Sequence, residues 1–533
     1  MTSSSTWYQN AVLYEVFVRA FADSNGDGIG DLPGLITKLD YLKDLGVDTV
    51  WLLPIAPSPL RDHGYDVSDY FNVHPEYGTL DDFRRLVREA HARDLRIVVE
   101  LIPNHTSDQH AWFQASRDPQ QPDHATYRDW YVWSDTDQKY QDTRVIFLDT
   151  EPSNWTFDPK RGQYYWHRFF HHQPDLNYDN PEVQQAMLRV VQFWIDQGAD
   201  GIRVDAPPYL FEREGTTCEN LPETHAYLKR LRAFVEAYSP NTMLLSEANQ
   251  WPEDVRAYFG DGDEFHMNFH FPLMPRIFMA LAKADRSPID AIMARTPALP
   301  SGCQWATFLR CHDELTLEMV TPDEREYMWN FYAPDPRMRL NMGIRRRLAP
   351  LLDNDQRRIK VAHSILLTFI GSPVLYYGDE IGLGDNIWLD DRNGVRTPMQ
   401  WDATVNAGFS AASPDRLYAP VGDDYDRVNV AAQQADPRSF FNWLKHALRV
   451  RKQHPAFGQG ELHLLPAANP ALLTYWRIDQ TDRVFVINNL SDQDQRSDLP
   501  DDRTYVDLLS GARSTRHVSL QPYQFLWLTP TAD

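Results

Sequence analysis

The chain has few cysteines and few cations, and each shortage excludes a class of protein. Three cysteines, Cys218, Cys303 and Cys311, in 533 residues are too few for a disulfide framework, and none forms a C-x-x-C pair. The 52 Lys and Arg residues are outnumbered by 75 Asp and Glu residues, which gives a formal net charge of −23. Because nucleic acids and anionic membrane surfaces are bound by clustered cations, we expect neither as a partner.

Long apolar runs are also missing. The longest, residues 365–377, is interrupted by Gly371, Ser372 and Pro373 and is too short to cross a bilayer. Residues 1–10 carry neither the basic segment nor the apolar run of a secretory signal. With so few cysteines, this predicts a cytoplasmic protein, and the sequence leaves homo-oligomerisation open. Tryptophan is abundant, with 16 residues, which suits a pocket that stacks sugar rings.

Short apolar runs alternate with amphipathic helical patterns through most of the chain. Eight runs rich in β-branched and aromatic residues predict buried strands, at 13–18, 49–53, 97–102, 202–204, 243–246, 265–269, 306–309 and 374–377. Helical patterns lie between them, among them 32–45, 80–94, 181–197 and 223–238. Eight such units predict an α/β protein with a (β/α)8 TIM barrel.

Three other segments do not fit simple barrel loops. Residues 105–172, rich in Trp, Tyr, Asp and His, predict a small inserted domain after the third strand. Residues 318–355 follow the seventh strand and predict a lid, since long insertions at this end often cover an active site. Short alternating runs over 457–533 predict a C-terminal antiparallel β-sandwich. The catalytic barrel is therefore assigned to 1–104 and 173–456.

Acidic residues follow three of the predicted strands, at the end where TIM barrels carry their catalytic groups. They are Asp205, Glu247 and Asp313, and two of them have an Arg or His close by in the sequence. A buried acid at a strand end is costly unless it has partners or a role. Glycoside cleavage needs one carboxylate as nucleophile or base and one protonated carboxyl as acid, which these residues can supply.

Several ordered motifs carry a resemblance to a known family. They lie at 64–66, 104–105, 173–177, 201–205, 247, 312–313 and 371–380. On these motifs the chain resembles the α-amylase-type retaining glycoside hydrolases from its first strand to its C-terminal sandwich. Further stretches at 134–136, 157–159, 164–170, 208–216, 313–320 and 335–355 are similar to the trehalose synthases within that family.

The resemblance implies a role for each acid. Asp205 would be the nucleophile, Glu247 the general acid and then the base, and Asp313 the group that stabilises an oxocarbenium-like transition state. Arg203, two residues before Asp205 on the same strand face, would keep the nucleophile ionised. The residues implied to bind the sugar are Asp62, Tyr65, His105, Arg203, His312 and Arg396.

Two positions depart from the family pattern. Glu100 stands four residues before the Asn-His pair, where the family usually has Asp, and its extra methylene predicts a displaced His105. Cys311 precedes the His-Asp pair, where the family usually has Asn, so an amide that donates and accepts hydrogen bonds is lost.

Two cation sites are expected, and no organic cofactor. Residues 23–31 place oxygen ligands at alternate positions with a Gly at the turn, as in the first half of a calcium loop, and predict Ca²⁺ or Mg²⁺. The ligands in that loop would be Asp23, Asn25, Asp27, Ile29 and Asp31. The resemblance implies a second Ca²⁺ between the barrel and the inserted domain, with the ligands Asn104, Asp175, Tyr209, Leu210 and Glu212.

The resemblance implies an intramolecular transglucosylase that interconverts maltose and trehalose, with some hydrolysis to glucose. An α-glucosidase that hydrolyses maltose, other short α-glucosides or sucrose stays open, since the motif at 396–401 occurs in that group too. A non-catalytic binding subunit on the same scaffold is the other alternative. Such subunits typically lose the catalytic acids and carry a membrane anchor, whereas Asp205, Glu247 and Asp313 are all present here.

Overall fold

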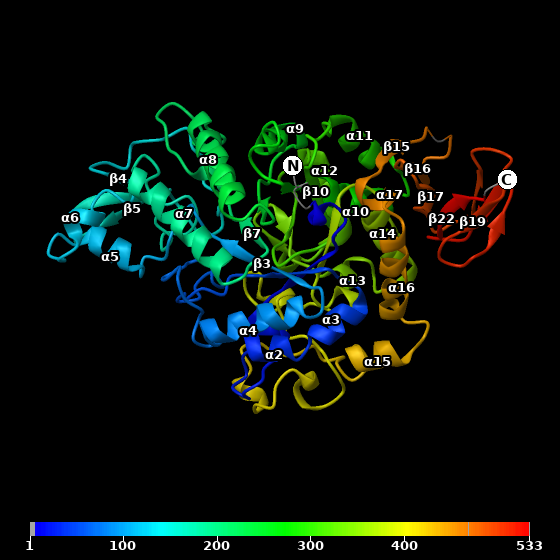
Figure 1. Cartoon of the computed structure of the whole chain (residues 1–533), viewed down its shortest axis with the longest axis horizontal. Helices are drawn as coiled ribbons and strands as arrows, with labels where there is room; N and C mark the ends of the chain where they lie inside the picture. The colour runs from blue at the N-terminus through cyan, green and yellow to red at the C-terminus, as the bar shows by residue number, and fades with distance from the viewer. Residues whose placement is uncertain (1–5, 467, 532–533) are drawn as a thin grey trace.

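Eight parallel strands close into a barrel at the centre of the computed structural model, which describes residues 6–466 and 468–531. Around the barrel the strands are β1 (Leu13–Val16), β14 (Ser372–Tyr376), β10 (Gln304–Phe308), β9 (Met267–Phe269), β8 (Met243–Ser246), β7 (Gly201–Val204), β3 (Arg96–Leu101) and β2 (Thr49–Leu52). Each overlaps one of the eight predicted strands, which confirms the TIM barrel (Figure 1). Nearly every strand residue is buried, because helices cover the outer face, and this explains the unbroken apolar runs.

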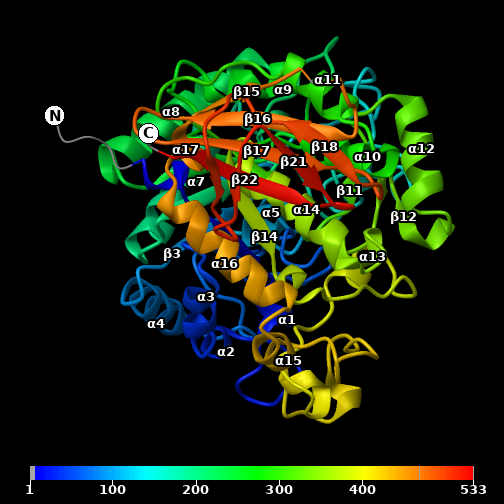
Figure 2. The same ribbon diagram turned by 90° about the vertical axis from the view of Figure 1, so that its right-hand side faces the viewer.

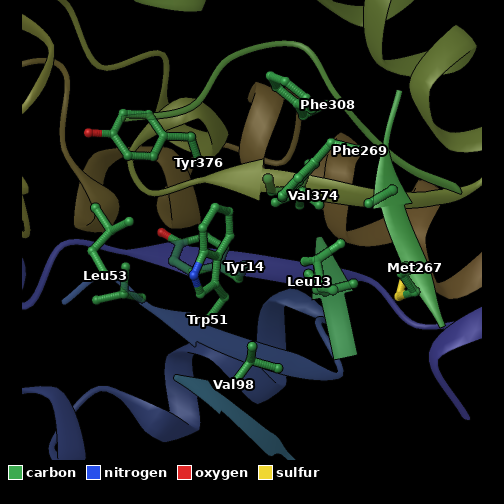
Figure 3. Packing of buried hydrophobic residues seen from close by; sticks show 14 of the residues in the cluster. Leu13, Tyr14, Trp51, Leu53, Val98, Met267, Phe269, Phe308, Val374 and Tyr376 are labelled. Carbon is green, nitrogen blue, oxygen red and sulfur yellow. The ribbon is translucent and has the colours of Figure 1, made fainter. Parts of the chain in front are cut away.

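Large side chains fill the barrel interior (Figure 3). The rings of Trp51 and Phe269 lie 5.6 Å apart, and those of Phe269 and Phe308 lie 5.5 Å apart. Such packing makes the barrel a solid core rather than a pore, so a site can form only at one of its ends.

Helices form the outer layer of the barrel. They are α1 (Val18–Phe21), α2 (Leu32–Ile36), α3 (Leu39–Leu45), α4 (Leu80–His91), α7 (Pro181–Asp196), α8 (Pro222–Tyr238), α9 (Pro252–Val255), α10 (Leu273–Lys283), α11 (Ser287–Arg295), α14 (Gln356–Thr368), α15 (Val430–Ala435), α16 (Phe440–Gln453) and α17 (Ala456–Gln459). The single helix predicted over 32–45 is wrong: Thr37 ends α2, its hydroxyl donating to the Gly34 carbonyl, and α3 starts afresh against α16. Within the described ranges, no helix has the length and apolarity needed to cross a membrane.

Two additions to the barrel lie on its carboxyl-terminal side. The segment between β3 and β7 carries α5 (Ala111–Arg117), α6 (His124–Tyr127) and a sheet of β4 (Trp133–Ser134), β6 (Gln163–Trp166) and β5 (Trp155–Asp158), at the left of Figure 1. The segment after β10 carries β11 (Leu315–Thr316), α12 (Pro322–Tyr332), β12 (Arg339–Leu340), β13 (Gly343–Ile344) and α13 (Leu348–Leu351). Strands β11, β13 and β12 form a small sheet of their own.

The C-terminal domain is antiparallel, as predicted, and stands at the right of Figure 1 and in front in Figure 2. Its larger sheet runs β15 (Glu461–Leu464), β16 (Leu472–Ile478), β17 (Arg483–Asn489), β22 (Phe525–Pro530), β19 (Tyr505–Asp507) and β20 (Arg513–Ser514). A second sheet pairs β18 (Gln495–Asp498) with β21 (His517–Leu520), and Val518 and Leu520 pack with Trp476 and Phe485 in one core. Trp527 donates from Nε1 to Ser364 of α14 at 2.9 Å, which fixes the domain to the barrel.

Phe441 on α16 tests how α16 is held to the barrel. Its ring is fully buried and stacks on Tyr41 of α3 at 5.5 Å. Phe441→Ala is expected to destabilise the barrel by about 3–5 kcal/mol, because it leaves a cavity that rigid helices cannot close. Thermal unfolding followed by circular dichroism measures this, with Lys445→Ala, at a half-exposed position of the same helix, as the control. Equal midpoints for both variants would contradict the packing argument.

Candidate active site

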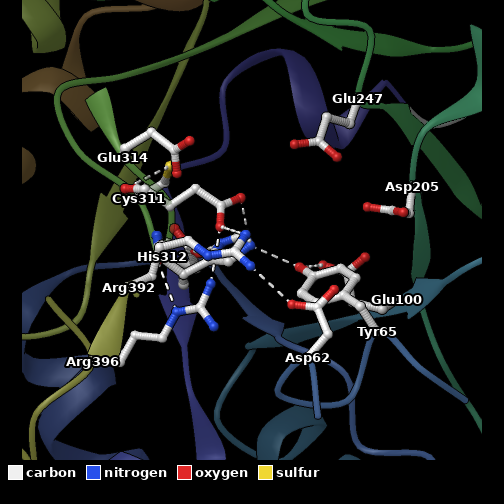
Figure 4. A network of polar contacts seen from close by, with 12 residues as sticks. Asp62, Tyr65, Glu100, Asp205, Glu247, Cys311, His312, Glu314, Arg392 and Arg396 are labelled. Atoms are coloured by element: carbon white, nitrogen blue, oxygen red, sulfur yellow. Dashed lines mark hydrogen bonds and ion pairs between the residues drawn. The ribbon is translucent and has the colours of Figure 1, made fainter. Parts of the chain in front are cut away.

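The three predicted catalytic acids converge at the carboxyl end of the barrel. Asp205 directly follows β7, Glu247 directly follows β8, and Asp313 lies in the loop after β10. The backbone N–H of Asp205 donates to Leu101 at 2.9 Å and that of Glu247 to Val204 at 3.1 Å, so both remain tied to neighbouring strands. All three acids line one cavity of about 150 Å³. Figure 4 shows the carboxylates of Asp205 and Glu247 close together on one side of it.

Arg203 is the charge that holds this side of the cavity together. Its Nη1 donates to Glu100 at 2.8 Å and to Asp205 at 2.7 Å, and its Nη2 contacts Glu247. The guanidinium is 1% exposed, so these interactions act in a medium of low polarity, where they are strong. One arginine thus bonds three carboxylates, and not all of them can ionise without a large cost.

The two central acids differ in how readily they ionise. Burial raises the pKa of Glu247 against the opposing charge of Arg203, and the carboxylates of Asp205 and Asp313 add to the increase. Burial also raises the pKa of Asp205, with Arg203 opposing it. The pKa of Glu247 comes to about 8, so this acid holds a proton at neutral pH, while the guanidinium of Arg203, 2.7 Å from Asp205, favours the ionised form of Asp205. This is the division that an acid and a nucleophile need.

Asp313 lies in the opposite environment. Its Oδ1 accepts from Arg392 and from Arg396, each at 2.9 Å, and its Oδ2 lies 3.1 Å from His312 Nε2. Burial alone would raise the pKa of Asp313, but His312 and Arg392 hold it well below its usual value. Burial lowers the pKa of His312, but the carboxylates of Asp313 and Glu15 raise it, and the pKa comes to about 9. Asp313 is therefore a fixed anion supported by three cations.

The predicted sugar-binding residues divide into two groups. Asp62, Tyr65 and His105 line the cavity with the acids, whereas Arg203, His312 and Arg396 lie behind its wall. The Tyr65 ring stacks on His312, with centroids 5.6 Å apart and planes 10° apart. His105 Nε2 is buried and has no hydrogen-bond partner among the residues that the structure describes. Burial lowers the pKa of His105 to about 3, so a neutral ring faces the cavity.

Arg392 is a wall residue that the sequence did not reveal. It lines the cavity and bridges Asp62 Oδ1 and Asp313 Oδ1, each at 2.9 Å. The resemblance implied that Arg396 binds the sugar, but Arg396 lies behind Asp313 and donates from Nε to the His312 carbonyl at 2.9 Å. Arg392 lies in a loop without periodicity, and its partners lie 330 and 79 residues away in the chain. Only the folded chain brings them together.

The two departures from the family pattern leave the cavity intact. Glu100 accepts from Trp51 Nε1 at 2.8 Å and from Arg203, so its longer side chain points toward Arg203. His105, which Glu100 was expected to displace, still lines the cavity. Cys311 is not part of the lining, and burial raises the pKa of its thiol well above the usual value.

Aromatic and lid residues complete the cavity wall. Phe147 and Phe169 come from the inserted segment, Phe271 follows β9, and Glu314 and Glu318 begin the segment after β10. Glu318 falls within the segment that was predicted to cover the site, whereas the individual aromatic residues were not predicted from the sequence.

The inserted segment and the lid meet across the mouth of the cavity. Arg144 Nη1 lies 3.2 Å from Glu318 Oε2, and the Asn341 N–H donates to Asp149 Oδ2 at 3.1 Å. The contacts join the two additions to the barrel above the acids.

At the second predicted calcium site, buried oxygens lack hydrogen-bond partners, and a bound cation would supply the missing interaction. The side-chain oxygens Asn104 Oδ1, Asp175 Oδ2 and Glu212 Oε1 are buried without a hydrogen-bond partner within residues 6–466 and 468–531. Oxygens of amide and carboxylate type are the ligands that Ca²⁺ prefers. No cluster of three or more His, Cys, Asp or Glu with metal-binding geometry occurs in the described ranges, so an ion here would also need amide and main-chain oxygens as ligands.

The loop at 23–31 is satisfied internally instead. Asp23 accepts from the N–H groups of Asn25, Gly26 and Gly28 at 2.8–3.0 Å, and Asp31 accepts from Ser24 and Gly34. Its oxygens have the right chemistry for a hard cation, but none is buried without a partner. This site stays a prediction.

Two known family models together match nearly the whole chain. The model of the α-amylase catalytic domain matches residues 15–331 and 343–460, and that of the maltogenic amylase C-terminal domain matches 462–527. The chain belongs to the α-amylase family. Its barrel is therefore an α-amylase catalytic domain, and its C-terminal domain is of the maltogenic amylase type.

The relatives of this chain differ in how similar they are to it: those named trehalose synthase are more similar than those named as glucosidases. "Trehalose synthase/amylase TreS" of Mycolicibacterium smegmatis is 59% identical over 508 residues, covering 92% of this chain and 85% of that protein. A trehalose synthase of Pimelobacter sp. is 56% identical, covering 95% and 91%. The oligo-1,6-glucosidase of Parageobacillus thermoglucosidasius is 31% identical, covering 94% and 93%.

Among solved structures, the trehalulose synthase MutB from Pseudomonas mesoacidophila superposes with a TM-score of 0.80 at 28% identity, covering 98% of this chain and 99% of that one. The α-glucosyl transfer enzyme XgtA gives the same TM-score at 29% identity, covering 99% and 100%. Both likenesses extend over the whole chain, beyond the barrel.

The pH dependence of turnover tests the assignment of acid and nucleophile. Activity requires Asp205 ionised and Glu247 protonated, so it should fall at low pH as Asp205 gains a proton and at high pH as Glu247 loses one. Because the pKa of Glu247 is raised, the alkaline limb should lie well above the ordinary value of 4.5. The measurement is kcat/KM for a chromogenic α-glucoside as a function of pH. An alkaline limb near 4.5 would refute the assignment.

Arg392→Gln tests the bridge between Asp62 and Asp313. The change leaves two buried carboxylates without a shared cation, so kcat/KM is expected to fall by about a hundredfold or more. Arg337→Gln is the matched control, because Arg337 is an arginine of the lid that pairs with Asp335 at the surface. A similar decrease of kcat/KM in both variants would refute a specific role for the bridge that Arg392 forms between Asp62 and Asp313.

Proposed function

We propose that this chain is an intramolecular transglucosylase that interconverts maltose and trehalose by a retaining double displacement, with some hydrolysis to glucose. The observation that carries the proposal is the step in similarity between relatives. Those named trehalose synthase are 54–59% identical over nearly the whole chain, whereas those named as glucosidases are 31–32% identical. The cavity supplies the acids that the chemistry requires.

In the first displacement Asp205 attacks the anomeric carbon of the non-reducing glucose, and Glu247 donates its proton to the bridging oxygen. The glycosidic bond breaks as a β-glucosyl ester forms, and the second glucose leaves as a neutral alcohol. Arg203 keeps Asp205 anionic before attack. Asp313 stabilises the positive charge that develops on the sugar ring, because it is an anion before the reaction starts.

In the second displacement the released glucose attacks the ester through its own anomeric hydroxyl, and Glu247 now accepts the proton. Two inversions at the same carbon give net retention, and the new linkage is α,α-1,1. The released glucose must rotate inside the cavity, so that its anomeric hydroxyl faces the ester, without leaving the cavity. Phe147 and Phe169, together with the Arg144–Glu318 ion pair, favour this by narrowing the path for glucose out and for water in.

The α-glucosidase alternative uses the same acids and differs only in the acceptor. It is favoured by the glucosidase names of the relatives at 31–32% identity. The products of maltose separate the two functions, since a mutase gives trehalose and a hydrolase gives glucose.

The deciding experiment is incubation of purified protein with maltose, with trehalose and glucose separated by chromatography over time. We expect trehalose as the main product and a minor fraction of glucose. Asp205→Asn should fold normally and lose nearly all turnover, because an amide cannot form the ester. Glucose alone would establish the hydrolase, and turnover of wild-type level in Asp205→Asn would refute the nucleophile. Sucrose, tested in parallel, covers the other donor of that alternative.

We also propose that Ca²⁺ is held by Asn104, Asp175 and Glu212, with the Tyr209 and Leu210 carbonyls, and that the loop at 23–31 holds a second Ca²⁺ or Mg²⁺. At the first site the ion would neutralise two buried carboxylates and join the barrel to the inserted segment. Its contribution would be structural, because it would bind the native state and not the unfolded chain. The cytoplasmic location stays part of the proposal, supported by three cysteines that are all free.

Removal of divalent cations tests the calcium proposal without any activity measurement. A strong chelator should lower the melting temperature by several degrees, and added Ca²⁺ should restore it. Glu212→Gln, which keeps the shape but removes a charge, should melt lower in Ca²⁺ and respond less to the chelator. A melting temperature that neither treatment changes, with no Ca²⁺ found by elemental analysis of the purified protein, would contradict both sites.

A further inference from the structure

A second cavity lies at the amino-terminal face of the barrel, at the opposite end from the acids. Its volume is about 200 Å³. Asp48 and Arg96 contribute to it from the start of β2 and β3, Trp7 from the segment before β1, and Arg451 and Lys452 from the end of α16. This face of a TIM barrel usually serves stability rather than catalysis, so a charged cavity there calls for an explanation.

Positive charge predominates in this cavity. The lining has three cations, Arg96, Arg451 and Lys452, and one carboxylate, Asp48. Both oxygens of Asp48 are already engaged, Oδ1 with Lys452 Nζ at 2.6 Å and Oδ2 with the Val12 N–H at 3.0 Å. Two arginines are therefore left without an anionic partner in the cavity.

Arg451 is the more deeply buried of these arginines, with 4% exposed. Its Nη atoms donate to main-chain carbonyls, among them Gly371 at 3.1 Å and Phe457 at 3.3 Å, but Nε has no partner in the part of the chain that the structure describes. No described carboxylate forms an ion pair with it. Burial and the neighbouring Arg477 lower the pKa of Arg451 to about 9. A buried cation without a counter-ion is costly, and an anion in the cavity would relieve that cost.

Arg96 presents a guanidinium that is unpaired. Its guanidinium carbon lies over the Trp7 ring, 4.7 Å from the ring centroid. Among the described residues its side chain has neither a hydrogen bond nor an ion pair, so its N–H donors remain free. A flat fork of free donors is well suited to an oxyanion.

The surface next to the cavity is also basic. A neighbouring hollow on the same side shares Lys452 and adds Lys43, Lys445 and Arg449, against one carboxylate, Asp44, which pairs with Lys445 at 2.5 Å. In a chain with a net charge of −23, a local excess of cations directs anions to this place and away from most of the surface.

We propose that the cavity at the amino-terminal face binds a phosphate group, held by Arg96, Arg451 and Lys452. Its volume accommodates a tetrahedral oxyanion, and the adjoining basic hollow leaves room for a larger molecule to extend outward. The phosphate belongs either to free inorganic phosphate or to a phosphorylated sugar. Such a site makes the stability of the barrel depend on phosphate without any contact with the catalytic acids.

The test measures binding of inorganic phosphate to the full-length protein by calorimetry and by the shift in melting temperature. Ionic strength is held constant with chloride, so that screening does not vary. We expect saturable binding with a rise in melting temperature. Arg96→Gln, at a partly exposed position, should fold normally and bind phosphate at least tenfold more weakly. Arg357→Gln, at an exposed position on α14 outside both hollows, is the matched control and should bind as the wild type does.

Glucose 6-phosphate and glucose, titrated in the same way, distinguish the two sources. Tighter binding of glucose 6-phosphate than of phosphate, lost in Arg96→Gln, identifies a phosphorylated sugar, and equal binding identifies free phosphate. Turnover of Arg96→Gln without phosphate should equal that of the wild type, which shows that the variant is folded. The proposal is overturned if phosphate binding is not saturable, or if Arg96→Gln and the wild type bind it equally.

Discussion

One buried arginine sets the chemistry of the active site. Arg203 bonds Glu100, Asp205 and Glu247 at the floor of the cavity, and it is 1% exposed. Without that charge, burial would protonate all three acids, and none would serve as a nucleophile. With the charge of Arg203 present, a limited amount of negative charge is distributed among the three acids, and Glu247 keeps a proton. Nucleophile and general acid are thus defined by one electrostatic balance.

The opposite wall of the cavity shows the converse arrangement. Asp313 is supported by His312, Arg392 and Arg396, so cations outnumber the acid there. The environment therefore raises the pKa of the aspartate on one wall, Asp205, and lowers the pKa of the aspartate on the other, Asp313. A reaction that moves one proton and develops one positive charge needs both conditions at once.

The sequence predicted what repeats along the chain, and it failed where distant segments meet. The barrel strands were predictable because both of their faces are buried, the outer one by helices and the inner one by the packed barrel interior, and the acids because they follow those strands directly. The break between α2 and α3 falls at Thr37 and Lys38, inside a continuous helical pattern, so periodicity could not reveal it. Arg392 and Phe147 lie in irregular loops, and their importance arises from partners far away in the sequence. The acids of the site were predictable, whereas much of the wall around them was not.

That difference bears on what distinguishes a mutase from a hydrolase. The acids alone cannot decide the acceptor, because both reactions need the same nucleophile, the same acid and the same transition-state anion. What decides is whether glucose stays and water is kept away while the ester exists. In the proposed mutase this task would fall to the inserted segment and the segment after β10, which meet through Arg144 and Glu318. These are the parts of the chain without strand or helix periodicity to predict their contacts. Specificity in this fold is therefore a property of how two loops close over a barrel, and the barrel itself supplies the chemistry that both reactions share.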